Sequence, residues 1–303
     1  MNAKRLFTAP ARRMAIPPYV WMVLFFLLPF AFVVKISLSQ TTLAQPPYLP
    51  VFSFADGFAG LKDALSALSF DNFRSLLADQ LYVSSYLRSI TVALTSTLLL
   101  LVIGYPIAYA MARLPSRWQG IAMILVIVPF WTSFLIRIYA WINILQHDGL
   151  LNQILMALHI VSAPVVWLST DTAMYLGIVY SYLPFMILPL YATLAKMDPS
   201  LLEAAADLGV SRANAFWMVT VPLSWRGVFA GALLCFIPIT GEFVIPDLLA
   251  GSDSMMIGQT LWLEFFTNKD WPLASALAVV LLAVLLVPLL VYDQVQRRQL
   301  ERR

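Results

Sequence analysis

The chain has 303 residues, of which 61% are hydrophobic and 12% are charged, and its formal net charge is +3. Soluble domains are about 45–50% apolar and about 25% charged, so this composition excludes a soluble globular protein. It predicts an all-α membrane protein, surrounded by membrane lipid, with no nucleic-acid partner. The single cysteine, Cys235, excludes an intramolecular disulfide and a cysteine-based metal site.

Six segments are apolar and long enough to span a bilayer, which takes about 20 helical residues. They cover residues 18–38, 86–111, 119–145, 172–195, 225–246 and 272–292. We expect the first to be a retained transmembrane helix, because the apolar run from Tyr19 to Val34 is longer than the roughly 7–15 residues of a signal-peptide core. Residues 39–85, which contain several Pro, Gly and Asp residues, are expected to form a folded loop with short helices.

The positions of Lys and Arg predict the orientation of these spans, because basic residues favour the cytoplasmic side. One side collects both basic ends of the chain, residues 1–17 and 293–303, together with Arg113, Arg117 and Lys196. The other side is mainly acidic. Both termini and the loop of residues 197–224 should therefore face the cytoplasm, and residues 39–85 should lie outside.

The cytoplasmic loop of residues 197–224 carries signals for two short helices. Asp198 and Pro199 form a helix start, because the carboxylate can accept free backbone N–H groups and the proline ring fixes φ. Gly209 suits the left-handed position that ends a helix, and Ser211 can cap a second helix. These signals alone are also compatible with an ordinary helical hairpin between two spans.

The first of these helices should have an apolar side and an acidic edge. The apolar side would contain Leu201, Leu202, Ala205 and Leu208. Glu203 and Asp207, four residues apart, would form the acidic edge. A short amphipathic helix between apolar spans is typical of a docking element.

The spacing of this loop resembles a family motif. Glu203-Ala-Ala is followed by Gly209, four residues after the second alanine, and by Pro222, thirteen residues later. This pattern is similar to the EAA loop of binding-protein-dependent ABC importer permeases. The resemblance implies a type I ABC importer (MetI-like) permease fold, in which a cytoplasmic coupling helix sits in a cleft of a separate ATPase. The coupling residues it implies are Glu203, Ala204, Ala205, Asp207, Gly209 and Arg212.

Four further segments resemble the PotB/PotH group, the permeases of putrescine and spermidine importers. They are residues 128–141, 177–186, 241–251 and 268–272. The resemblance implies a core permease domain of five helices over residues 86–292, after a first helix at 18–38 and a periplasmic loop at 39–85. It also implies the bacterial inner membrane and three partners: two copies of a cytoplasmic ABC ATPase, a distinct second permease chain, and a periplasmic polyamine-binding protein.

The residues of these segments fit the chemistry of a polyamine. A flexible polycation requires carboxylates to offset its charge and aromatic faces for cation–π contacts. The candidates for the substrate pathway are Trp131, Tyr139, Tyr180, Tyr182, Phe185, Glu242 and Asp247, with Trp141 close in sequence. Glu242 lies about 17 residues beyond Trp225, roughly 25 Å along a helix, which predicts a position near the outer edge of the bilayer.

Other interpretations of these residues remain open at this point. Glu242 could form a structural ion pair with Arg137, and the Trp and Tyr residues could belong to an interfacial aromatic belt. The solute could be another small cationic or opine-like molecule. A secondary transporter is a further alternative, although no internal repeat is visible.

A membrane enzyme is disfavoured, because no Ser/His or metal-ligand constellation lies within the spans. The sequence has no Gly-x-x-x-x-Gly-Lys-Ser/Thr phosphate-binding loop, so ATP hydrolysis is expected on a partner chain. No cofactor or metal is expected. His147 and His159 are interpreted as loop residues.

Overall fold

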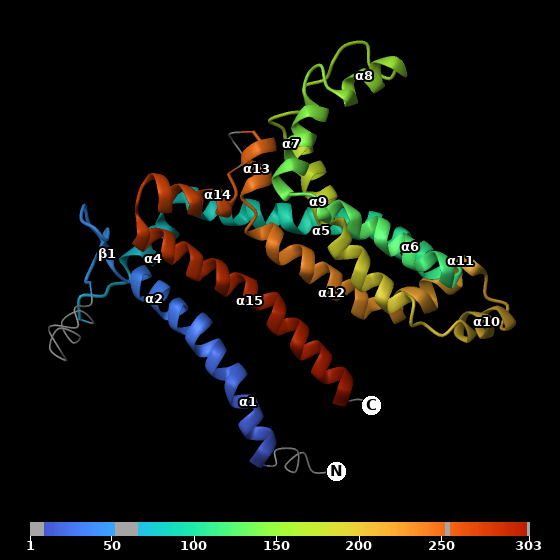
Figure 1. Ribbon diagram of the computed structural model, residues 1–303, viewed down its shortest axis with the longest axis horizontal. Coiled ribbons are helices and arrows are strands. Elements are labelled where there is room, and N and C mark those ends of the chain that lie inside the picture. The colour runs from blue at the N-terminus through green and yellow to red at the C-terminus, as the bar shows by residue number, and fades with distance from the viewer. Residues whose placement is uncertain (1–8, 52–65, 252–254, 302–303) are drawn as a thin grey trace. The chain divides into compact units, whose positions relative to one another are not determined.

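The computed structural model describes residues 9–51, 66–251 and 255–301 (Figure 1). Several charged positions used to predict orientation lie outside these residues, among them Lys4, Arg5, Asp56, Lys62, Asp63 and Asp253. The described chain is largely helical and forms two compact units. Unit 1 contains residues 1–80 and 261–284, and unit 2 contains residues 81–260 and 285–303.

Unit 1 holds the first apolar helix and the folded loop that follows it. Its elements are α1 (Ala9–Met22), η2 (Val23–Leu27), α2 (Leu28–Ser37), β1 (Gln40–Thr41), β2 (Tyr48–Leu49), α4 (Asp71–Ala78), η6 (Leu263–Thr267) and the start of α15 (Trp271–Glu301). The amide of Asn72 donates to the backbone oxygens of Ser37 and Ser39, both at 2.8 Å, which ties α4 to the end of α2. The short helix α4 fits the predicted folded loop, whereas the two-residue antiparallel strands were not predicted.

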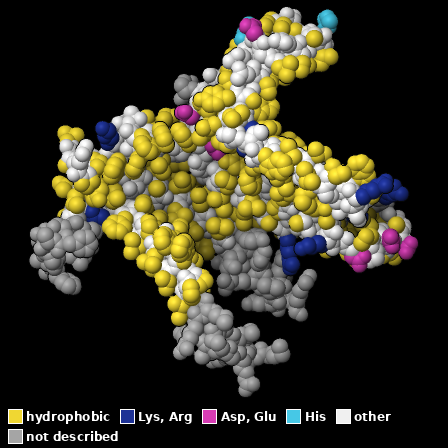
Figure 2. Space-filling model, viewed as in Figure 1, with side chains coloured by type: hydrophobic (Ala, Val, Ile, Leu, Met, Phe, Trp, Pro, Cys, Tyr) yellow, Lys and Arg dark blue, Asp and Glu magenta, His cyan; other side chains and the backbone are white. Residues whose placement is uncertain are grey.

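Unit 2 contains most of the helices. They are α5 (Gln80–Arg113), α6 (Ser116–Ile127), η4 (Val128–Trp131), α7 (Phe134–Leu145), α8 (Leu150–Ala157), α9 (Asp171–Leu194), α10 (Ser200–Asp207), α11 (Arg212–Ala215), η5 (Phe216–Thr220), α12 (Val221–Thr240), α13 (Val244–Leu249) and α14 (Ile257–Trp262). Hydrophobic side chains cover most of their visible surface, and acidic side chains gather over α10 (Figure 2). An apolar exterior of this kind is suited to lipid and to apolar partner surfaces.

The described residues include five helices that are long and apolar enough to cross a membrane, and a sixth candidate made of two bent pieces. The bent candidate corrects the prediction of one straight span over residues 119–145. Its two pieces, Ser116–Trp131 and Phe134–Ala157, meet at 88°. Thr132 and Ser133 have extended backbone angles between the pieces, and Pro129 supplies no N–H to continue the helix.

The predicted span over residues 225–246 also needs correction. Helix α12 ends at Thr240, and the chain turns at Gly241 before the short helix α13 begins at Val244. Glu242 therefore lies in the turn between two helices and not within a continuous span.

The core of unit 2 is built around α9 and α12, which lie side by side (Figure 1). Gly227 and Gly231 on α12 allow this close approach. A Cβ atom added to Gly227 would lie 2.6 Å from Oγ1 of Thr193, and one added to Gly231 would lie 2.8 Å from Sδ of Met186. Two small residues four positions apart are a common device for packing membrane helices.

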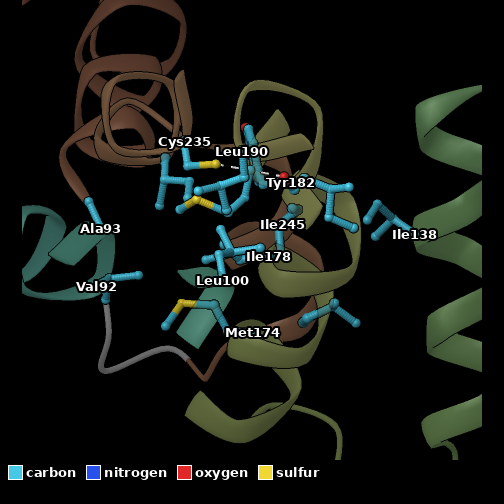
Figure 3. Packing of buried hydrophobic residues seen from close by; sticks show 14 of the residues in the cluster. Val92, Ala93, Leu100, Ile138, Met174, Ile178, Tyr182, Leu190, Cys235 and Ile245 are labelled. Atoms are coloured by element: carbon cyan, nitrogen blue, oxygen red, sulfur yellow. Dashed lines mark hydrogen bonds between the residues drawn. The ribbon is translucent and has the colours of Figure 1, made fainter. Parts of the chain in front are cut away.

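Buried side chains from five helices meet around this pair (Figure 3). The figure labels Val92, Ala93 and Leu100 from α5, Ile138 from α7, Met174, Ile178, Tyr182 and Leu190 from α9, Cys235 from α12 and Ile245 from α13. The thiol of Cys235 lies 3.7 Å from the backbone oxygen of Tyr182. This core fixes the position of Tyr182.

Candidate functional site

The first helix of the cytoplasmic loop, α10, begins as the sequence predicts. The carboxylate of Asp198 accepts a hydrogen bond from the N–H of Ser200 at 3.0 Å, and Pro199 has helical backbone angles. This backbone hydrogen bond lowers the pKa of Asp198. The loop therefore has a defined helical start.

Gly209 ends α10 in the left-handed conformation, with a φ of +78°. The N–H of Gly209 donates to the oxygen of Ala206 at 2.9 Å, and the N–H of Val210 donates to that of Ala205 at 3.0 Å. This pair of bonds is a Schellman motif. The next helix, α11, starts at the predicted cap, because Oγ of Ser211 accepts from the N–H of Asn214 at 3.3 Å.

The apolar side of α10 differs from the prediction. Ala205 is buried and Leu202 is half-buried, but Leu201 is exposed and Leu208 is 84% exposed. Leu201, Ala204 and Leu208 instead form an exposed apolar row, because positions three and four apart share one face of a helix. We call this the α10 row; Glu203, Asp207 and Arg212, which are also exposed, lie close to it in sequence.

Two of the predicted pathway residues, Tyr182 and Glu242, meet inside unit 2. Glu242 is 8% exposed, and its carboxylate accepts a hydrogen bond from the hydroxyl of Tyr182. Its other oxygen accepts from the backbone N–H groups of Val244 at 3.1 Å and Ile245 at 3.4 Å. The carboxylate therefore also caps the start of α13.

The structure places Glu242 along α9, and its position near the outer edge of the bilayer stays a prediction. Tyr182 is the twelfth of the 24 residues of α9, about 16 Å from the start of that helix. The turn at Gly241 brings Glu242 back against this middle part of α9. Helix α12 runs without a break from Val221 to Thr240, so the count from Trp225 holds to within two residues of Glu242.

The alternative ion pair between Glu242 and Arg137 is absent among the described residues. Three aromatic rings, in successive contact, connect the guanidinium of Arg137 to the carboxylate of Glu242. The guanidinium of Arg137 lies 4.8 Å from the ring centre of Phe130, Phe130 lies 5.2 Å from Phe185, and Phe185 lies 6.0 Å from Tyr182. We call Phe130, Phe185 and Tyr182 the aromatic row.

The other predicted pathway residues are not part of the aromatic row. Tyr180 packs edge-on against Trp141, with ring centres 5.4 Å apart. Trp131 is 79% exposed, and Tyr139 and Asp247 are also exposed. Within one chain these three have the exposure expected of residues that face lipid, water or a partner subunit.

Sequence reasoning missed Phe130, although it lies in the segment 128–141. Trp and Tyr are more readily recognised as candidates because they carry polar atoms, whereas a phenylalanine in an apolar segment has no such mark. The ring of Phe130 lies just before the bend and packs edge-on against Phe185, with ring centres 5.2 Å apart.

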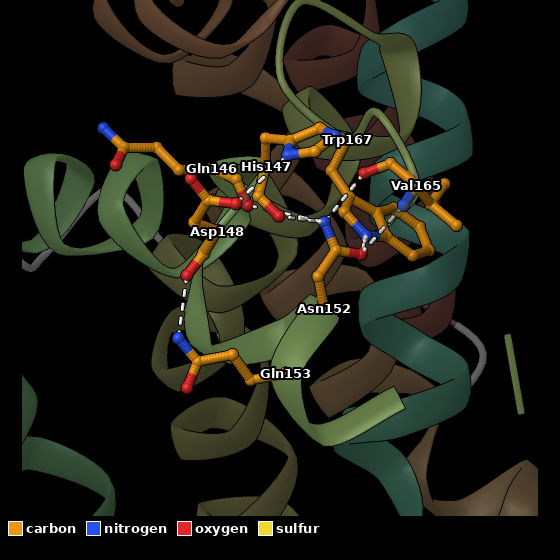
Figure 4. A network of polar contacts seen from close by, with 7 residues as sticks. All are labelled: Gln146, His147, Asp148, Asn152, Gln153, Val165 and Trp167. Carbon is orange, nitrogen blue, oxygen red and sulfur yellow. Dashed lines mark hydrogen bonds and ion pairs between the residues drawn. The ribbon is translucent and has the colours of Figure 1, made fainter. Parts of the chain in front are cut away.

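A second missed residue is Asn152 of α8, which organises the connection between α7 and α9 (Figure 4). Its side chain is fully buried. Its amide nitrogen contacts the backbone oxygens of Gln146, His147 and Val165, and its oxygen accepts from the N–H of Val165 and the indole N–H of Trp167. A polar residue inside the apolar run Leu150–Ala157 was the available signal.

Comparisons with known proteins give the family of the chain. A family model described as the inner membrane component of binding-protein-dependent transport systems matches residues 102–301. The spermidine/putrescine transport system permease protein PotB of Escherichia coli K12 is 40% identical over 227 residues, which cover 75% of this chain and 82% of the relative. PotB of Haemophilus influenzae is 37% identical over 225 residues, 74% of this chain and 78% of the relative.

Two further proteins are more distant. The inner membrane ABC transporter permease protein YdcU of Escherichia coli is 32% identical over 225 residues, 70% of this chain and 71% of the relative. A chain in the crystal structure of a bacterial alginate ABC transporter, in complex with a periplasmic protein bound to an alginate pentasaccharide, superposes with a TM-score of 0.72. That match covers 95% of this chain and 94% of the other at 16% identity, so it supports the fold alone.

Proposed function

Because the chain belongs to the family of inner-membrane components of binding-protein-dependent transport systems, we propose that it is the permease subunit of an ATP-driven polyamine importer. The solutes would be putrescine, spermidine or both. The observation that carries this proposal is the 40% identity to a spermidine/putrescine permease over 82% of that relative. As a family member, the chain is a multi-pass permease of the inner membrane.

The chemistry of the aromatic row supports a cationic solute. Glu242 provides a buried negative charge that the hydroxyl of Tyr182 contacts, and the ring of Phe185 follows, 6.0 Å from that of Tyr182. An ammonium group beside these residues would gain a carboxylate partner and cation–π contacts. Each cation–π contact is worth about 0.5–2 kcal/mol. A polyamine carries several such groups along a flexible chain and could use both ends of the row.

The proposed assembly contains the partners that an importer of this kind requires. This chain would form half of the pathway with a distinct second permease, and two copies of a cytoplasmic ATPase would bind the α10 row and its neighbours. A periplasmic polyamine-binding protein would deliver the solute. In this arrangement both termini face the cytoplasm, and closure of the ATPase moves α10.

The direct test is uptake of labelled putrescine and spermidine in cells with and without this chain, the partner genes being expressed in both. Loss of uptake on deletion is expected, and the two labels show which amine is preferred. Equal uptake in the two strains would exclude polyamines as the solute. The family assignment would stand in that case, because it does not depend on the substrate.

A further inference from the structure

Arg137 on α7 is a buried cation without a conventional partner. The residue is 9% exposed, and its Nε and Nη1 atoms have no hydrogen-bond acceptor in the part of the chain that the structure describes. The guanidinium lies over two rings instead, 4.8 Å from the centre of Phe130 and 5.7 Å from that of Phe134. Buried charges in membrane helices are usually paired, so a guanidinium held by aromatic faces is held weakly.

The carboxylate at the other end of the aromatic row does not neutralise Arg137. Glu242 already has three donors: the hydroxyl of Tyr182 and the backbone N–H groups of Val244 and Ile245. Hydrogen bonds to a charged acceptor stabilise it without a cation. The row therefore has a positive charge at one end, a satisfied negative charge at the other, and aromatic rings between them.

We propose that Arg137 is a resident cation of the transport pathway. It occupies on Phe130 an aromatic face that a solute ammonium group would otherwise take, and an arriving cationic solute displaces it. The inference rests on the proposed function, because only a cation competes with a guanidinium for an aromatic face. Until displaced, the charge of Arg137 opposes the entry of small inorganic cations, as a fixed arginine does in other selective pores.

Competition with a resident cation lowers the apparent affinity for the solute. The solute binds only to the fraction of molecules in which the aromatic face is free, and the apparent dissociation constant rises as that fraction falls. Removing the resident cation should therefore strengthen solute binding by about threefold to tenfold. A residue that only stabilises the fold would have the opposite effect or none.

The experiment measures equilibrium binding of labelled putrescine and spermidine to the purified permease–ATPase complex in nanodiscs, without the binding protein. Arg137→Met removes the charge and keeps an unbranched side chain, and it should bind the amines about threefold to tenfold more tightly. Arg137→Lys keeps a cation and should stay within about twofold of the unmodified chain. In a Phe130→Leu background, where the contested ring is gone, Arg137→Met should no longer change the affinity.

Several results would overturn the resident cation. The first is unchanged or weaker amine binding by Arg137→Met when the variant is present at normal membrane levels. The second is an equal effect of Arg137→Met on the affinity with and without Phe130. The third is no detectable amine binding by any variant although cells take up the amine. Loss of both Arg137→Met and Arg137→Gln from the membrane, with Arg137→Lys retained, would show a structural charge instead. Absence of polyamine uptake by the unmodified importer is a different result, which refutes the proposed function itself.

Discussion

The carboxylate of Glu242 is held by donors from two helices, α9 and α13, and each donor reduces the cost of burying a charge. The hydroxyl of Tyr182 is the side-chain donor among them, and the other two are backbone groups that a substitution does not remove. Hydrogen bonds to charged groups contribute about 1.5–3 kcal/mol. Tyr182 is therefore the residue through which this carboxylate can be tested.

Tyr182→Phe should destabilise the permease by about 1.5–3 kcal/mol, because a buried carboxylate loses one of three donors. The measurement is thermal unfolding of the purified complex. Tyr180→Phe is the matched control, since the Tyr180 hydroxyl makes no hydrogen bond to a described residue and its ring contact with Trp141 is kept. Equal melting temperatures for the two variants would contradict the role given to Tyr182.

Gly209 can be tested through its backbone angle. A Cβ atom at this position would meet nothing within 4 Å, so a substitution is costly only because φ is +78°. Gly209→Val should therefore reduce uptake strongly, since β-branched residues avoid the left-handed region. Gly209→Asn should keep most of it, because asparagine tolerates that region.

Uptake and membrane levels of both Gly209 variants provide the measurement. Similar losses of uptake for valine and asparagine would show that the side chain itself disturbs the docking surface. The conformational explanation would then be wrong.

Residue-scale prediction succeeded where the chemistry is local. Asp198, Gly209 and Ser211 were assigned from neighbours within three residues, and the structure shows all three in the expected conformations. The partner of Glu242 could not be assigned in the same way. Tyr182 is 60 residues away in sequence, and Arg137 was the more obvious partner by charge alone.

At the scale of helices, the packing of α9 against α12 depends on two glycines. Gly231→Leu should destabilise the permease by about 1–3 kcal/mol, because its side chain would overlap Met186. Gly120→Leu on α6 is the control, since a Cβ there meets nothing within 4 Å. Thermal unfolding and the amount of protein in the membrane are the readouts, and equal behaviour of the two variants would contradict the proposed close packing.

The connection from α7 to α9 should depend on Asn152. Asn152→Leu leaves the N–H groups of Val165 and Trp167 without their acceptor, a cost of about 1–3 kcal/mol per buried group. Hydrogen exchange in residues 146–168 should become at least about tenfold faster, while α9 and α12 keep their protection. Gln153→Leu, which removes one exposed bond to the oxygen of Asp148, should have little effect; equal exchange in both variants would exclude Asn152 as the organising residue.

The helices themselves were largely predictable, because each span is a long apolar run. The bend between Trp131 and Phe134 was not predicted, since residues 119–145 have no interruption in hydrophobicity. At Gly241 the sequence offers a possible interruption of the fifth span, and the structure shows the helix ending there. Hydrophobicity reports burial in lipid or protein, but it does not report the direction of the chain.

At the scale of the whole molecule, the orientation in the membrane remains a prediction from charge. The single cysteine makes it testable, because Cys235→Ala removes the native thiol. In that background, His147→Cys in the α7–α8 turn should react with an impermeant maleimide in intact cells. Asn214→Cys in the cytoplasmic loop should react only after permeabilisation; the reverse pattern would invert the proposed topology.

The helical run that leaves the cytoplasmic loop has a mechanical consequence. Residues from Arg212 to Thr240 form one span of 29 residues, about 43 Å long, and Glu242 follows two residues after its end. A rigid rod of that length that tilts by about 5° shifts its far end by roughly 4 Å. That shift exceeds the length of a hydrogen bond, so a tilt of this size relative to α9 would be enough to part Glu242 from Tyr182. A motion of α10, next to the start of this span, would therefore be transmitted along the span to the buried carboxylate of Glu242.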